Sequence, residues 1–150
     1  MDTEGLLRCL NARSVRYVVI GATAFPVHGY ARATLDVDIF IDPMRDNAVK
    51  ARAALSDVGY DLTDVSVEDL LTKKVLIRQY ILEVDIHPFA KGVTFDEVWR
   101  NRVEDRVGDT PAAFASLGDL IRMKEAAGRP KDLEDLKVLR KIQEGAGSGG

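Results

Sequence analysis

The run "LDVDIFID", Leu35 to Asp42, has the pattern of a β-strand that can bury only one of its two faces. Apolar side chains recur at every second position, at Leu35, Val37, Ile39 and Ile41. Asp36 and Asp38 project from the other side, about 7 Å apart, where they repel each other and lose solvation unless a cation lies between them. The pattern therefore predicts a strand whose acidic side binds one or two hard divalent cations, Mg²⁺ first and Mn²⁺ second. A solvated strand face is the alternative, because isolated Asp-x-Asp triplets are common.

The residues just upstream predict an anion-binding turn. "RYVVIGA" is rich in β-branched and aromatic residues, which predicts a buried strand that ends at Gly21. A helix is expected next, with Thr23 as its N-cap, Pro26 in its first turn and Gly29 near its end. A strand that ends in glycine before a helix aims free backbone N–H groups at an anion such as phosphate. Together with the two carboxylates, this turn indicates a metal-dependent enzyme that handles a nucleoside triphosphate.

A third carboxylate lies in a second alternating segment, "ILEVDIHPF". Its apolar residues alternate with three polar ones, Glu83, Asp85 and His87. If this strand pairs beside the first, Asp85 can join Asp36 and Asp38 around the metal and accept the proton of an attacking hydroxyl. Glu83 is the substitute for Asp85, and His87 can line the same pocket. The alternative is that Glu83 and Asp85 only solvate an edge strand.

Helical and strand patterns alternate along the whole chain, which is typical of the α/β or α+β class. With 150 residues, of which 46% are hydrophobic, the chain can bury one core. We expect a single domain over residues 1–144, with its core over about 1–112 and C-terminal helices over about 116–143. The glycine-rich segment 145–150 is predicted to be disordered.

Local signals place the other elements. Asp42 and Pro43 predict the N-cap and first residue of a helix through 45–58 that stops at Gly59. Segments 74–80 and 81–89 have the pattern of consecutive strands that can form a hairpin. Further helices are expected at 3–12, 67–73, 117–127 and 131–143.

Charge and cysteine content exclude several classes of protein. The formal net charge is −3, from 21 basic and 24 acidic residues, so the chain as a whole does not attract nucleic acids or anionic membranes, while local basic patches stay open as an alternative. Cys9 is the only cysteine, which excludes an internal disulfide framework and suits a reducing cytosol. The longest apolar stretch, "YVVIGATAFPV", is too short to span a membrane. We therefore expect a soluble, cytoplasmic domain without a membrane partner.

Three segments together resemble the minimal nucleotidyltransferases of the DNA polymerase beta-like superfamily, particularly the small bacterial proteins related to toxin–antitoxin nucleotidyltransferases. They are "YVVIGATAFPVHGYARATLDVDIFID", "LEVDIHPF" and "LGDLIRMKEAAGRPKDLEDLKVL", and the match extends over most of the chain, from residue 17 to residue 139. That family carries Gly-Gly or Gly-Ser at the end of a strand, then Asp-x-Asp, then a third acid on a later strand. The resemblance implies a short mixed sheet flanked by helices, with a C-terminal helical pair. It also implies that Gly21 contacts the triphosphate, that Asp36 and Asp38 hold two Mg²⁺ ions, and that Asp85 binds one of them and activates the acceptor.

Further residues match positions around the family's nucleotide. Ala22 stands where the family has glycine or serine, so a hydroxyl is lost there, although the backbone N–H remains and Thr23 can substitute. Arg32 and Thr34 match a recurrent Arg-x-Thr before the carboxylates, in which the arginine can face phosphate. An ordinary loop role is the alternative for both.

A basic group lies in the C-terminal segment. Lys124, Arg129 and Lys131 surround a helix–helix junction, from which they can reach a triphosphate or the leaving pyrophosphate. Lys124 is the first candidate and Arg129 the second. Asp132 is expected to pair with Arg129 or to cap the last helix rather than to bind metal.

The expected reaction is transfer of a nucleoside monophosphate from a nucleoside triphosphate (NTP) to an acceptor hydroxyl, with release of pyrophosphate. The acceptor is a tRNA, a protein or a small molecule, and the base of the NTP is open, because pockets depend on shape rather than on motifs. The alternative is a catalytically weak binding protein of the same fold that acts with a toxin or antitoxin partner. Ala22 favours this alternative, and the three intact acids speak against it. His28 and Trp99 are interpreted as structural.

Overall fold

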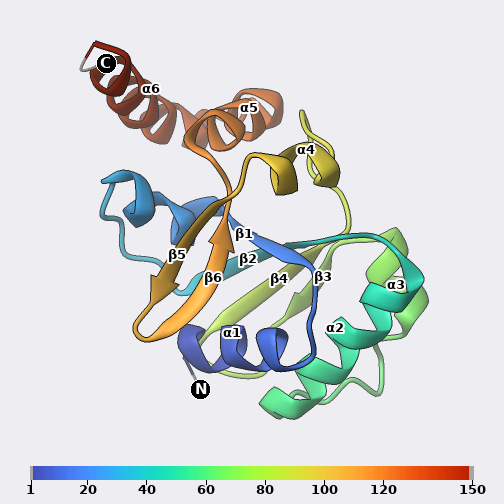
Figure 1. Ribbon diagram of the computed structural model, residues 1–150. Coiled ribbons are helices and arrows are strands. Elements are labelled where there is room, and N and C mark those ends of the chain that lie inside the picture. The colour runs from blue at the N-terminus through green and yellow to red at the C-terminus, as the bar shows by residue number, and fades with distance from the viewer. Residues whose placement is uncertain (1, 149–150) are drawn as a thin grey trace.

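A six-stranded mixed sheet with helices around it forms the centre of the computed structural model, which describes residues 2–148 (Figure 1). The strand order is β3-β4-β2-β1-β6-β5. The strands are β1 (Tyr17–Ile20), β2 (Asp36–Ile41), β3 (Val75–Ile77), β4 (Glu83–His87), β5 (Val103–Val107) and β6 (Thr110–Phe114). This is the α/β class with a short mixed sheet that the sequence predicts.

Six α-helices and two short 3₁₀ helices surround the sheet in the described part of the chain. They are α1 (Thr3–Ala12), η1 (Gly21–His28), α2 (Arg45–Val58), α3 (Val67–Thr72), α4 (Phe95–Arg100), α5 (Leu117–Ala127), η2 (Pro130–Asp132) and α6 (Leu133–Ser148). Helices α1 and α2 lie side by side below the sheet in Figure 1, and α5 and α6 form the predicted C-terminal pair at its upper end. Among the residues described, no helix combines the length and apolar composition that crossing a membrane requires.

Strand β2 alternates as the sequence predicts from Asp36 onward, but Leu35, predicted on its apolar face, precedes the strand and is exposed. Val37, Ile39 and Ile41 are buried in the core, while Asp36 is exposed and Asp38 is half-buried on the other side. Phe40 shares the side of the acids but is also buried, because its ring meets the ring of Phe95 from α4 edge-on, with the centroids 5.3 Å apart. Helix α4 therefore covers one end of this side of β2 and leaves the acidic end open.

The helix after β1 differs from the prediction. It is a 3₁₀ helix that begins directly at Gly21, and its N-cap residue is Ile20 rather than Thr23. The Thr23 hydroxyl instead donates to the backbone carbonyl of Asp36 at 3.0 Å, so it joins this helix to the start of β2. Gly29 ends the helix in the left-handed conformation, as predicted, with φ +93°.

The start of α2 also corrects a prediction. The helix begins at Arg45 after Met44, without a side-chain cap, so Asp42 and Pro43 are neither its N-cap nor its first residue. The backbone carbonyl of Asp42 accepts hydrogen bonds from the Met44 N–H and from the Asn47 amide. This local turn delays the helix by two residues.

The β3–β4 hairpin is confirmed as an antiparallel pair. The β5–β6 hairpin is not anticipated by the sequence analysis, although Gly108-Asp109 at its turn is a recognised two-residue hairpin signal. At the C-terminus, α6 continues through Ser148, so residues 145–148 of the predicted disordered tail are helical. Residues 149–150 lie outside the described residues.

Candidate functional site

The acids of the two alternating segments meet because β2 and β4 are neighbouring parallel strands. Their register sets Asp36 beside Glu83 and Asp38 beside Asp85. Partner residues of paired strands project to the same face of a sheet, so all four carboxylates share one face. The second strand therefore pairs beside the first. This pairing is the condition under which Asp85 can join Asp36 and Asp38.

Asp38, Asp85 and His87 form a group with the geometry of a metal site. One potential ligand atom from each lies within 4.8 Å of the others. His87 Nε2 is 2.8 Å from Asp38 Oδ1, and this contact orients the carboxylate. Carboxylate oxygens and an imidazole nitrogen together suit Mg²⁺ or, better, Mn²⁺. From the sequence, His87 is expected only to be able to line the pocket.

Asp85 is the most buried of the four acids, with 7% of its surface exposed. Its Oδ1 is enclosed and accepts no hydrogen bond from any described residue. Arg78 Nη1 lies 2.7 Å from that oxygen, but its N–H groups point at the backbone carbonyls of Ile77 and Val84, so the contact is an ion pair without hydrogen-bond alignment. A buried carboxylate oxygen with free lone pairs fits a cation ligand.

Asp36 lies at the open end of the site. It is exposed and stands outside the group of three that Asp38, Asp85 and His87 form, although it shares their face. The neighbouring carboxyl group of Asp36 favours a proton on Glu83 and, together with desolvation, raises the pKa of Glu83 above its ordinary value. The positive charge of Arg78, whose Nε lies 3.5 Å from the Glu83 carboxylate, acts in the opposite direction and lowers this pKa. Asp36 and Glu83 thus form a second carboxylate pair next to the first.

Gly21 sits directly against Asp38. Its φ is +68°, a conformation that favours glycine, and a Cβ added there would lie 2.5 Å from Asp38 Oδ2. Antiparallel pairing of β1 with β2 produces this closeness, because Ile20 is the partner of Asp38. Ala22 and Thr23 follow in the first turn of η1. The predicted phosphate-binding turn and the predicted metal-binding acids are therefore adjacent.

Three of the cations that the sequence predicts to face phosphate, Lys124, Arg129 and Arg32, are held by two buried aspartates. Lys124 Nζ lies 2.9 Å from Asp132 and 3.3 Å from Asp135. Arg129 pairs with Asp132 at 2.7 Å, as the sequence analysis expects. Arg32 pairs with Asp135 at 2.7 Å. Asp135, which the sequence analysis does not single out, also accepts a hydrogen bond from the Tyr30 hydroxyl at 2.9 Å and so joins the loop before β2 to α6.

Asp132 shows how strongly this network is held. Burial alone would raise its pKa, but hydrogen bonds from Arg129 and Lys124, together with their charges, outweigh burial and lower the pKa of Asp132 to about 2. The side chains of Arg32 and Arg129 remain 44% and 52% exposed, whereas the Lys124 side chain is only 17% exposed. Arg32 and Arg129 therefore keep N–H groups free for an anion, and Lys124 is committed to the network.

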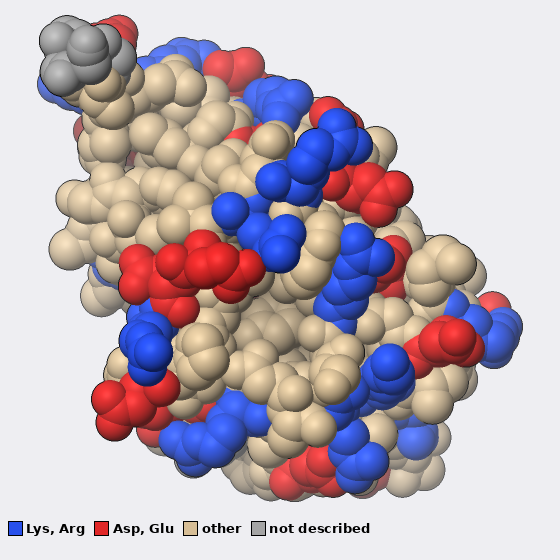
Figure 2. All heavy atoms as spheres, in the orientation of Figure 1, with Lys and Arg blue, Asp and Glu red and all other residues tan. Residues whose placement is uncertain are grey.

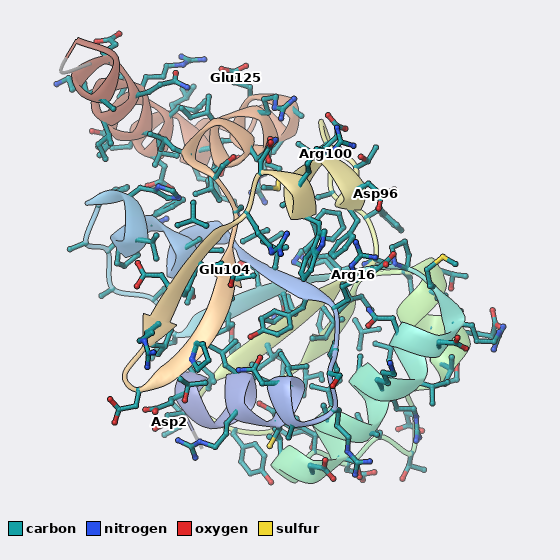
Figure 3. The ribbon with its side chains drawn as sticks, in the orientation of Figure 1. Asp2, Arg16, Asp96, Arg100, Glu104 and Glu125 are labelled. Carbon is teal, nitrogen blue, oxygen red and sulfur yellow. The ribbon has the colours of Figure 1, made fainter. Side chains whose placement is uncertain are left out.

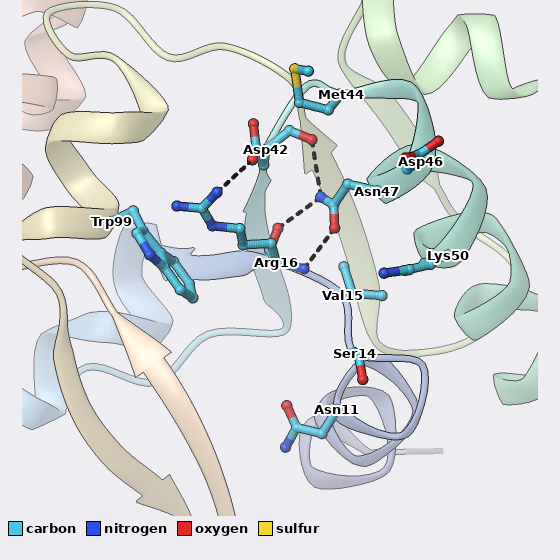
Figure 4. A pocket seen from close by; sticks show the side chains of 10 residues that line it. All are labelled: Asn11, Ser14, Val15, Arg16, Asp42, Met44, Asp46, Asn47, Lys50 and Trp99. Atoms are coloured by element: carbon cyan, nitrogen blue, oxygen red, sulfur yellow. Dashed lines mark hydrogen bonds and ion pairs between the residues drawn. The ribbon is translucent and has the colours of Figure 1, made fainter.

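A separate cavity of about 520 Å³ lies at the opposite ends of the same strands (Figure 4). Arg16, which precedes β1, and Asp42, which follows β2, line it together with Trp99 and Lys50. Figure 2 shows a hollow whose rim carries both basic and acidic side chains, and Figure 3 labels Arg16, which lines this cavity, and Glu104, which lines a smaller second cavity. Trp99 packs on Phe95 and under Arg102, whose Cζ is 3.9 Å from the ring centroid.

His28, by its contact with the Ala115 carbonyl at 2.8 Å, is structural as expected.

A glycine turn beside acids on two neighbouring strands of a mixed sheet defines a nucleotidyltransferase-like domain. Comparison with protein families agrees. The chain belongs to the family described as a nucleotidyltransferase of unknown function (DUF6036), which it matches over residues 5–143. This confirms the resemblance seen in the sequence. No match to the chain was found among curated proteins.

Proposed function

We propose that this protein transfers a nucleoside monophosphate from an NTP to an acceptor hydroxyl. The observation that carries the proposal is the position of Asp38, which has Gly21 against its carboxylate on one side and Asp85 beside it on the other. A phosphate-binding turn and a pair of metal-binding carboxylates on adjacent elements are what a metal-dependent phosphoryl transfer needs. Membership of the nucleotidyltransferase family supports the same reaction.

Asp38 and Asp85, with Asp36 and His87 beside them, would hold the divalent cation, Mg²⁺ or Mn²⁺. When bound, such ions neutralise charge on the phosphates and lower the pKa of the acceptor hydroxyl. The acceptor oxygen then forms a bond to the α-phosphorus, the bond from this phosphorus to the α–β bridging oxygen breaks, and pyrophosphate leaves. Asp85 accepts the proton of the acceptor hydroxyl, a role that its burial beside Asp38 favours.

The chain offers nucleotide contacts on the other side of Asp38. The backbone N–H groups of Gly21 and Ala22 would bind the triphosphate at the start of η1. Arg32 and Arg129, whose side chains are about half exposed, would contact its outer phosphates. Lys124 would act through the network that positions these arginines, since two aspartates already hold it.

A second candidate function is a catalytically weak binding protein that acts with a toxin or antitoxin partner. Ala22 favours it, because the position lacks a phosphate-binding hydroxyl and the nearby Thr23 hydroxyl already donates to the carbonyl of Asp36.

The acceptor of the enzymatic reaction would be a tRNA, a protein or a small molecule. A cytoplasmic location fits the single cysteine of the chain.

The test is label transfer from each of the four common NTPs, labelled at the α-phosphate, in cell extract with Mg²⁺ or Mn²⁺. We expect one class of macromolecule or metabolite to gain label with wild-type protein and not with Asp38→Asn. An Arg106→Gln variant, altered at an exposed arginine on the distant edge strand β5, is the matched control and should label like wild type. Absence of labelling with all four NTPs and both metals would favour the binding protein.

A further inference from the structure

Two basic side chains reach into the acid cluster, and neither belongs to the cations that the sequence analysis assigned to phosphate. Arg78, one residue after β3, places Nη1 2.7 Å from Asp85 Oδ1. Lys74, one residue before β3, places Nζ 3.7 Å from Asp85 Oδ2. Both oxygens of Asp85 therefore face a cation that the chain itself provides.

The Arg78 guanidinium balances the negative charge of Asp85 but donates no hydrogen bond to its Oδ1. The Nη1 group donates to the Ile77 carbonyl at 3.1 Å and lies 3.5 Å from the Val84 carbonyl, so its N–H groups point away from Asp85. Asp85 Oδ1 is enclosed and accepts no hydrogen bond among the described residues. Its lone pairs remain open to another ligand, while its charge is balanced by the guanidinium.

We propose that Arg78 takes the place of a divalent cation at Asp85 in the metal-free protein, and that metal binding displaces it. A divalent cation held by Asp38, Asp85 and His87 would lie close to a guanidinium 2.7 Å from Asp85, and the two charges would repel each other. The side chain of Arg78 is 40% exposed, so it can turn into solvent when the metal arrives. Arg78 therefore sets the metal concentration at which the site fills. This inference rests on the proposed function, because it takes the cation from there.

Arg78→Gln tests the proposal by isothermal titration with Mn²⁺ and by thermal unfolding with and without the metal. Glutamine keeps an amide that can reach the Ile77 carbonyl but removes the charge. We expect the dissociation constant for Mn²⁺ to fall about tenfold, and that of Lys74→Gln to fall less, because Lys74 is farther from Asp85. In EDTA the Arg78→Gln protein should melt below wild type, since Asp85 has lost its counter-ion, and saturating Mn²⁺ should close that gap.

Arg102→Gln is the matched control. Arg102 also donates to a backbone carbonyl, that of Trp99 at 2.8 Å, and pairs with a carboxylate, Glu104 at 2.7 Å, but away from the four acids. Its melting deficit should be the same with and without Mn²⁺, and its Mn²⁺ affinity should equal that of wild type. If Arg78→Gln does not fold, Arg78→Met, which keeps the aliphatic stem, is assessed by the same two measurements.

Two results would overturn the inference. The first is a dissociation constant for Mn²⁺ within twofold of wild type. The second is a melting deficit that Mn²⁺ leaves unchanged, which would make Arg78 a structural residue for the β3–β4 hairpin. If wild type binds Mn²⁺ and Arg78→Gln gives either result, this inference is wrong and the proposed function is unaffected. Failure of wild type to bind Mn²⁺ at all would defeat both.

Discussion

At the scale of single residues, Asp85 separates an enzyme from a binding protein. Asparagine at this position removes the charge at nearly constant shape, so the fold should survive and the nucleotide should still bind through Gly21 and Asp38. Transfer of label to the acceptor should fall by ~10³-fold or more, because metal activation and proton acceptance belong to the chemical step. The measurement is the initial rate of label transfer at matched protein concentration, with NTP affinity measured in parallel. Full transfer activity in Asp85→Asn would remove Asp85 from the catalytic role.

Gly21 provides a second prediction at this scale. Alanine at Gly21 meets two penalties, the strained φ of +68° and a Cβ 2.5 Å from Asp38 Oδ2. The second penalty pushes the Asp38 carboxylate away, so we expect Gly21→Ala to weaken Mn²⁺ binding about tenfold as well as NTP binding.

Gly29→Ala is the control for Gly21→Ala. It carries the same kind of backbone strain, with φ +93°, but its added Cβ meets nothing within 4 Å. Calorimetry should therefore find Gly29→Ala less stable but unchanged in Mn²⁺ affinity. Equal Mn²⁺ affinity in the folded Gly21→Ala protein would show that Asp38 is not the metal ligand that Gly21 protects.

At the scale of elements, two buried aspartates join the C-terminal helices to each other and to the loop before β2. Asp132 ends η2 and binds Lys124 of α5, and Asp135 lies in the first turn of α6 and binds Arg32. Their contacts place the loop that leads into β2. The C-terminal pair is thus connected to the acid-bearing strand through charge pairs.

The pH dependence of stability tests this connection. The pKa of Asp132 is about 2 in the folded protein, below its ordinary value of 3.8, so the folded state binds fewer protons and is stabilised wherever Asp132 is ionised in both states. That stabilisation, roughly 2 kcal/mol, should be complete above about pH 5 and be lost as the pH falls from 4 to 2. Denaturant unfolding should show Asp132→Asn less stable than wild type at pH 6, with the two approaching each other by pH 2.5. A difference between them that stays constant with pH would contradict the charge-pair origin.

At the scale of the whole molecule, metal binding should appear as stability. The four acids on one face repel one another, so Mg²⁺ or Mn²⁺ at millimolar concentration should raise the melting temperature of wild type. At a metal concentration 100 times the dissociation constant the gain is about 2.7 kcal/mol. Asp38→Asn should lose it. A wild-type melting curve that is indifferent to both metals would count heavily against the site.

Much of the fold is predictable because its signals are local. The β2 alternation, the hairpin of β3 with β4 and the helix stop at Gly59 follow from side-chain periodicity and from glycine geometry. The start of α2 is not predictable in this way, because Asp42 and Pro43 carry a common N-cap signal but here form a turn held by Asn47. The end of α6 differs for a related reason, since a glycine-rich composition does not by itself stop a helix already begun at Leu133.

In the candidate site, too, features set by local sequence are predictable and features set by distant segments are not. The sequence alone is enough to predict that Asp36 and Asp38 share one side of a strand, and that Asp85 and His87 share one side of another, because a period of two residues is a property of the strand alone. The fold is needed to show that β4 lies parallel to β2 with Asp85 beside Asp38, and that Arg78 faces the Asp85 carboxylate while Lys124 faces Asp132. The register of two strands and the partners of a long cationic side chain depend on segments distant in the sequence, and no local pattern records them.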